Sequence, residues 1–134
     1  MAELFRLEIA TPERRLVDEQ VDEAQIPARN GYIGVLAGHA PLLAELGTGF
    51  LSYHAGSRRW RLAVHRGFVE VLPGHVRVLA DAAEKAEDID VERARREMEQ
   101  ARQQLANPAL GVDPAMSLEA IDRARAWLDA ADRK

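Results

Sequence analysis

The feature that most constrains this chain is a change in the period of its hydrophobic pattern near residue 87. Before that point, apolar and polar residues alternate in short runs, and eight of the nine glycines and six of the seven aromatic residues occur there. After it, apolar residues recur three or four positions apart, among ten acidic and eight basic residues. A period of two is typical of strands, and a period between three and four is typical of helices. The sequence therefore predicts two domains, a β-domain over 1–87 and a helical domain over 88–134.

The β-domain is predicted from alternation in four segments. Residues 5–9, 59–65, 69–71 and 76–80 place one set of side chains on a core face and the other set in water. Turn sequences recur at roughly ten-residue spacing, at 11–12, 30–31, 47–49, 56–57, 66–67 and 73–74. Because no helical pattern lies between these turns, an antiparallel arrangement is favoured over βαβ units. We expect an N-terminal antiparallel β-sandwich of about ten short strands.

The C-terminal segment is expected to form two helices, so the predicted fold class is α+β. The apolar seam of the first helix is Val91, Ala94, Met98, Ala101 and Leu105, and that of the second is Leu118, Ile121, Ala124, Leu128 and Ala131. Asn107-Pro108 ends the first helix, and Asp113-Pro114 begins the second, with Ser117 as an alternative N-cap. The short connection predicts an antiparallel two-helix hairpin. Because alanine fills much of each narrow seam, little apolar area is buried, and the hairpin is expected to be able to leave its docking surface.

The composition excludes several classes of function. The chain has 134 residues, no cysteine, a net charge of −4, and four histidines in separate turns or strands. A disulfide framework, a metal site and a general nucleic-acid-binding surface are therefore not expected. No run approaches the ~20 apolar residues of a membrane span, and the N-terminus lacks the pattern of a secretory signal. Phosphate-binding glycine loops and nucleophile motifs are absent, so we expect no enzymatic activity and no required cofactor.

The cluster Arg58-Arg59-Trp60-Arg61 has two interpretations. Arginine interleaved with an aromatic residue can bind nucleic acid. In a strand, however, Arg59 and Arg61 point away from the face that holds Trp60, which suits a solvent face over a core face. We favour the structural interpretation and expect no nucleic-acid partner.

An ordered set of segments resembles the epsilon subunit of bacterial F-type ATP synthases. The segments are 7–13 (LEIATPE), 34–43 (GVLAGHAPLL), 67–71 (GFVEV) and 76–81 (VRVLAD), followed by the two-helix tail. The resemblance covers essentially the whole chain. It implies a non-catalytic rotor subunit of the central stalk, which joins the gamma subunit to the membrane c-ring and couples proton flow to ATP synthesis. It also implies a peripheral position on the cytoplasmic face of the plasma membrane, and inhibition of ATP hydrolysis when the hairpin extends toward the catalytic alpha and beta subunits.

The resemblance implies two interfaces on the β-domain and one on the tail. Gly38, His39, Ala40 and Pro41 match the family's turn near gamma. Arg29, Asn30, Gly31 and Tyr32 match the loop that meets the polar loops of the c-ring, although Arg29 and Tyr32 replace the acidic-glycine pattern common there. In an extended hairpin, Arg95 and Arg96 could meet acidic surfaces of the catalytic subunits.

The segment 89–94 (IDVERA) is similar to the ATP-binding motif of Bacillus-type epsilon subunits. The candidate ATP-binding residues are Glu84, Ile89, Asp90, Arg93, Ala94 and Arg123. Arg93 could bind phosphate oxygens, and Asp90 could accept a hydrogen bond from the adenine amino group.

The resemblance implies a second arginine four residues after Arg123, but Trp127 stands there, and its ring could stack on adenine. In the competing interpretation, Asp90 caps the helix and Arg93 is a solvated charge. The alternative function is therefore an ATP-sensing module whose hairpin closes on bound ATP as a regulatory ligand.

Overall fold

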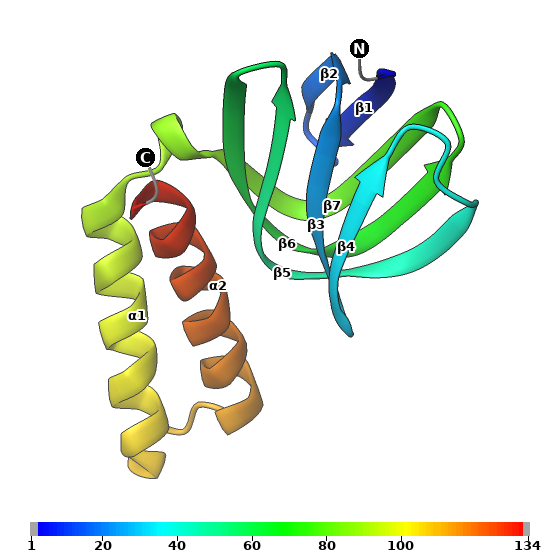
Figure 1. Cartoon of the computed structure of the whole chain (residues 1–134). Coiled ribbons are helices and arrows are strands. Elements are labelled where there is room, and N and C mark those ends of the chain that lie inside the picture. The colour runs from blue at the N-terminus through cyan, green and yellow to red at the C-terminus, as the bar shows by residue number, and fades with distance from the viewer. Residues whose placement is uncertain (1–2, 133–134) are drawn as a thin grey trace.

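The computed structural model describes residues 3–132, so residues 1–2 and 133–134 of the two predicted domains lie outside it. Seven strands come first: β1 Phe5–Ala10, β2 Arg15–Val21, β3 Glu23–Ala28, β4 Gly31–Leu36, β5 Leu42–Ala55, β6 Arg58–Leu72 and β7 His75–Lys85. They are followed by the 3-10 turn η1 Ala86–Asp88, helix α1 Val91–Ala106, the 3-10 turn η2 Pro108–Leu110 and helix α2 Pro114–Asp132. Figure 1 shows the strands folded into a sandwich, with the two helices side by side along one flank of it.

The predicted fold class is confirmed, but the strand count and one pairing differ from expectation. The described strands number seven, in one continuous sheet of order β2-β1-β7-β6-β5-β3-β4. β1 and β7 are parallel, whereas the other pairs are antiparallel. The count is lower because β5 and β6 span 14 and 15 residues and curve across the sandwich (Figure 1). The sequences at 47–49 and 66–67, predicted as turns, lie inside these strands, since glycine lets a strand bend without ending.

The core of the sandwich comes from the alternation seen in the sequence. The inward-facing side chains of β1, of the end of β6 and of the start of β7 are almost completely buried. They are Phe5, Leu7, Ile9, Val69, Val71, Val76 and Val78. Aliphatic side chains dominate, as the low aromatic content requires. Their burial supplies the main driving force for the β-domain.

The ends of the hairpin helices are where the sequence places them. Asp90 accepts a hydrogen bond from the backbone nitrogen of Arg93 at 3.1 Å and caps α1. Asp113 accepts one from the backbone nitrogen of Ala115 at 2.9 Å, directly before α2 begins. Both are N-cap contacts in which a carboxylate satisfies an N–H group that lacks a helical partner.

The seam of α1 is confirmed at its centre, where Ala94, Met98 and Ala101 are buried. The seam predicted for α2 is only partly correct. Ile121 and Ala124 are buried, but Leu118 is 51% exposed.

A second stripe of α2 packs on the outer face of β6. Ala126, Trp127 and Ala130 form a buried cluster with Ala63. The alternation predicted to place Ala63 and His65 in water is therefore wrong, because α2 covers that face of the strand. A single helical seam cannot describe a helix that packs on two partners.

Candidate functional site

The turn predicted to lie near gamma connects β4 to β5. Gly38 has φ +81, in the left-handed region that favours glycine, and its N–H donates to the carbonyl of Pro73 at 2.8 Å. The backbone nitrogen of His39 donates to the carbonyl of Leu36 at 3.2 Å. The imidazole Nδ1 of His39 lies 2.7 Å from the carbonyl of Ala40. These contacts link the turn to the end of β4 and to the connection between β6 and β7.

The loop predicted to meet the c-ring lies at the other end of β4 (Figure 1). Arg29 and Asn30 form a two-residue turn between β3 and β4. The Arg29 guanidinium pairs with Glu45 at 2.7 Å, and the Tyr32 hydroxyl donates to the carbonyl of Phe50 at 2.9 Å. Because β4 has six residues, about 20 Å of strand separates the two predicted interfaces.

An apolar patch on the outer face of β5, β6 and β7 was missed in the sequence analysis. It consists of Leu43, Phe68 and Leu79, which are 71%, 56% and 50% exposed. Phe68 lies opposite Leu79 on β7, and Leu43 lies opposite Glu70, two positions along β6 from Phe68. The signal was available, because the patch residues occupy outward-facing strand positions of the kind that Glu70 and Arg77 fill with charges.

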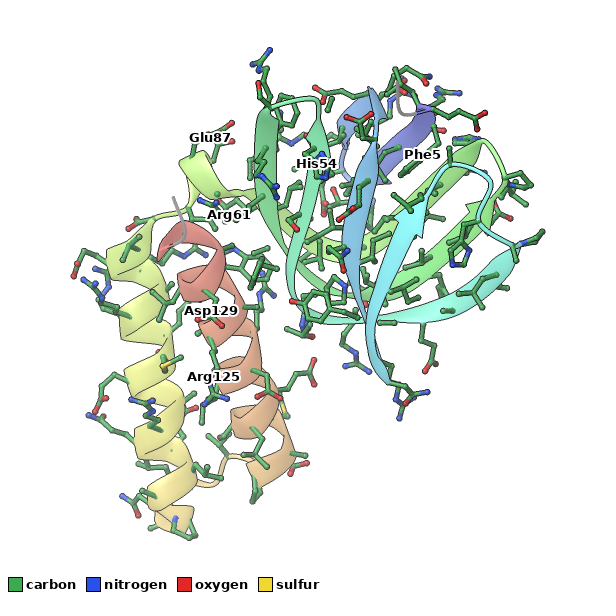
Figure 2. All side chains as sticks on the ribbon, viewed as in Figure 1. Phe5, His54, Arg61, Glu87, Arg125 and Asp129 are labelled. Carbon is green, nitrogen blue, oxygen red and sulfur yellow. The ribbon has the colours of Figure 1, made fainter. Side chains whose placement is uncertain are left out.

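The C-terminal half of α2 has two polar contacts with the sandwich. The Trp127 indole nitrogen donates to Glu84 at 2.7 Å. Arg61, which Figure 2 places between the sheet and the end of α2, donates from Nε to the carbonyl of Ala130 at 3.4 Å. The N-terminal half of α2 contributes Glu119, which pairs with Arg66 at 2.9 Å and with His65 at 3.2 Å. The hairpin is therefore attached to the sandwich at both ends of α2.

The structure brings together five of the six candidate ATP-binding residues. Glu84, Asp90, Arg93, Ala94 and Arg123 line one cavity of about 90 Å³, together with Glu97, Ala124 and Trp127. Ile89 does not line it and packs against the cluster around Trp127. Asp90 caps α1, as the competing interpretation predicts.

The cavity is small for a nucleotide while the hairpin is docked on the sandwich. Its volume is about 90 Å³, whereas ligand pockets begin at roughly 300 Å³. The Arg123 guanidinium lies 5.1 Å from the ring centre of Trp127, and Arg93 donates to Glu97 at 3.0 Å. Both arginines that would bind phosphates are engaged by the chain itself.

The described residues 3–132 contain no group of three histidine, aspartate or glutamate side chains arranged to hold a metal ion. In the same part of the chain, no helix combines the length and the apolar character needed to cross a membrane.

The comparisons with known proteins agree over the whole chain. Residues 4–86 match the ATP synthase delta/epsilon chain beta-sandwich domain, and residues 87–132 match the ATP synthase delta/epsilon chain long alpha-helix domain. The sequence is 56% identical over 134 residues to the ATP synthase epsilon chain of Solibacter usitatus, covering 100% of both chains. It is 47% identical over 105 residues to that of Koribacter versatilis, covering 78% of this chain and 74% of the relative.

Two solved assemblies contain a chain of similar structure. A chain of the Euglena gracilis mitochondrial ATP synthase, in an OSCP/F1/c-ring assembly, has a TM-score of 0.84 at 26% identity, covering 99% of this chain and 84% of that one. A chain of the Tetrahymena thermophila mitochondrial central stalk and c-ring shares the fold, with a TM-score of 0.64 at 12% identity and coverage of 97% and 98%. The resemblance seen in the sequence is confirmed, and the chain belongs to the epsilon-chain family of ATP synthases.

Proposed function

We propose that the chain is a non-catalytic subunit of the central stalk of an F-type ATP synthase, linking the gamma subunit to the c-ring. The match over both domains carries this proposal, since curated relatives that cover the whole chain are ATP synthase epsilon chains. The Euglena gracilis chain of similar fold comes from an assembly that contains F1 and the c-ring. Held through the c-ring, the subunit would lie at the cytoplasmic face of the membrane and rotate as proton flow drives ATP synthesis.

The surface of the sandwich supports a contact with gamma. The patch of Leu43, Phe68 and Leu79 exposes large apolar side chains, which on soluble proteins mark interaction surfaces. Leu43 follows the Gly38–Pro41 turn in the sequence by two residues, so the patch and the turn form neighbouring parts of one surface. The family resemblance implies gamma as the partner of this surface. The Arg29–Tyr32 loop at the far end of β4 would then contact the c-ring.

The hairpin is proposed to be the inhibitory element. Alanines dominate its contact with β6, and alanine burial contributes little apolar area for each residue. A helix held mainly by small side chains and a few polar contacts can leave the sandwich and extend toward the catalytic subunits. There, Arg95 and Arg96, both exposed, would meet acidic surfaces.

The test is ATP hydrolysis by the matching catalytic complex that lacks its epsilon subunit. The full chain is added in one arm and residues 1–87 in the other, with circular dichroism to establish that the shorter chain is folded. We expect the full chain to slow hydrolysis and the shorter chain to bind without slowing it. If neither chain binds the complex, the proposed function is wrong.

The second candidate function, an ATP sensor, is favoured by one observation. Residues from β7, α1 and α2, distant in sequence, meet at the cavity that contains Asp90, Arg93 and Arg123. Because Trp127 lines this cavity and leaves only about 90 Å³ free while the hairpin is docked, ATP would enter it only after the indole had moved. Calorimetry with ATP tests this candidate and is described below.

A further inference from the structure

The polar contact at the N-terminal half of α2 is built around a buried histidine. His65 of β6 is 7% exposed, and its Nε2 lies 3.2 Å from the carboxylate of Glu119 on α2. Its Nδ1 lies 2.9 Å from the hydroxyl of Thr48 on β5. A neutral ring satisfies both contacts, because Nε2–H donates to Glu119 while Nδ1 accepts from the Thr48 hydroxyl.

The backbone next to this histidine departs from regular strand geometry. Arg66 has φ +55 and is the one non-glycine residue with a positive φ among residues 3–132. The pairing of β6 with both of its neighbours is interrupted at this residue. Such a conformation persists only where the surroundings impose it, and here it accompanies the 2.9 Å ion pair between Arg66 and Glu119.

Charged groups of both signs face the histidine. Glu119, Asp122, Arg125 and Asp129 of α2, Arg66 of β6, Asp81 of β7 and the Arg29–Glu45 pair line the same groove, and Arg123 of α2 acts on the ring from nearby. Of these charged groups, only Glu119 forms a hydrogen bond with the imidazole, and the Arg66 guanidinium shares that carboxylate. A second positive charge at His65 would therefore compete with Arg66 for one acidic partner.

We propose that His65 is a proton-sensitive clasp that holds the hairpin on the sandwich while the ring is neutral and loosens it when the ring is protonated. The inference rests on the proposed movement of the hairpin. Acidification would shift the chain toward the released hairpin, which is the state proposed to inhibit hydrolysis.

The direction follows from the two states of the ring. In the docked hairpin, burial lowers the pKa of His65 from its ordinary 6.5, and the charge of Arg123 lowers it further, against the opposing hydrogen bond to Glu119. When α2 leaves the sandwich, the His65 ring becomes exposed to solvent and its pKa returns toward the ordinary value. The chain with the released hairpin then binds the proton more readily than the docked chain. Docking is therefore strongest above pH 6.5 and weakens as the pH falls below that value. One proton changes the docking equilibrium at most about tenfold for each pH unit.

The experiment measures hairpin docking across this range. The chain has no native cysteine, so a dye pair can be placed at Asn30→Cys in the β3–β4 turn and Ala109→Cys near the hairpin tip. The β3–β4 turn and the hairpin tip both lie at the lower end of the docked molecule in Figure 1, so departure of the hairpin increases the distance that the pair reports. We expect energy transfer in the full chain to fall as the pH is lowered from about 7.5 to about 5.5. His65→Gln, which keeps a donor and an acceptor but cannot titrate, should remove this dependence. His54→Gln, which alters a histidine that Figure 2 places on the sandwich away from α2, should leave it unchanged.

Three outcomes would overturn the clasp: no change of energy transfer in the unaltered chain, a change of opposite sign, or an unaltered dependence in His65→Gln. The unaltered chain alone suffices for the first two, so they do not depend on the folding of a variant. Binding of gamma by the same labelled chain at about pH 7.5 separates this failure from a failure of the proposed function, because the gamma surface lies on the sandwich and does not include His65.

Discussion

The indole nitrogen of Trp127 on α2 lies 2.7 Å from a carboxylate oxygen of Glu84 on β7, and this hydrogen bond joins the hairpin to the sandwich. The ring is 8% exposed and packs against Ala63 and Ala94, with the guanidinium of Arg123 over its face. The indole thus forms one wall of the cavity in which the family resemblance would place a nucleotide.

Replacing Trp127 with phenylalanine tests the contribution of this hydrogen bond. Trp127→Phe keeps an aromatic ring but removes the donor to Glu84, so we expect docking of α2 to weaken by about 1–2 kcal/mol. Urea unfolding followed by the helical signal measures the change. Glu84→Gln is the matched control, because the glutamine amide oxygen still accepts the hydrogen bond from the indole. Docking of α2 should weaken less in Glu84→Gln than in Trp127→Phe. No loss in Trp127→Phe would contradict a contribution of this hydrogen bond to docking.

Calorimetry with ATP tests the nucleotide cavity. At millimolar ATP we expect no binding heat from the unaltered chain, because the cavity beside Trp127 has a volume of only about 90 Å³. In addition, Arg93 donates to Glu97 and Arg123 lies over the Trp127 ring. Trp127→Arg removes the indole and adds the missing cation, and this variant should bind ATP. Saturable binding by the unaltered chain would instead support the ATP-sensing function.

The apolar patch predicts where gamma binds. Phe68→Ser and Leu79→Ser each remove a large exposed side chain from its centre, and each should weaken gamma binding about 30-fold, the effect of an interface hot spot of about 2 kcal/mol. Surface-immobilised gamma provides the measurement. Leu110→Ser is the matched control, because Leu110 is 57% exposed but lies in η2 at the hairpin tip. Equal binding by all four proteins would contradict a gamma interface at this patch.

Gly67 is required by the packing of β6 on β7. Its φ is +134, and a Cβ atom at this position would lie 1.9 Å from the carbonyl oxygen of Leu79. Gly67→Ala should therefore destabilise the sandwich by more than about 3 kcal/mol, since the obstructing atom is backbone. Gly74→Ala meets no atom within 4 Å and should change the free energy of unfolding little. Thermal unfolding of both variants decides the point.

The ion-pair network on β1 predicts how stability depends on pH. Hydrogen bonds from Arg15 and His75 lower the pKa of Glu8 below its ordinary 4.5 in the folded chain. A carboxylate with a depressed folded-state pKa contributes stability that is fully present above pH 4.5. This contribution is lost as the pH falls from 4.5 through the folded-state pKa. Denaturant unfolding between about pH 6 and about pH 3 should show a smaller loss in Glu8→Gln than in the unaltered chain. Glu13→Gln, an exposed carboxylate in the turn before β2, should behave like the unaltered chain.

The sequence by itself determined the change from strands to helices, the inward faces of β1, β6 and β7, and the caps of both helices. These features depend on local rules. Alternation places Leu7 and Val69 inside, and the carboxylates of Asp90 and Asp113 cap the helices that they precede. The family was also visible in the sequence, because its segments are contiguous and follow in order.

The tertiary structure alone decided which surfaces meet. α2 packs on the outer face of β6, so Ala63 and His65 are buried where the alternation predicts water. The same packing places Trp127 against Glu84 and closes the cavity at Arg93, although these residues are far apart in the chain. Such contacts depend on the curvature of the long strands and on the free energy of covering one face with another. No short segment of the sequence encodes either of them.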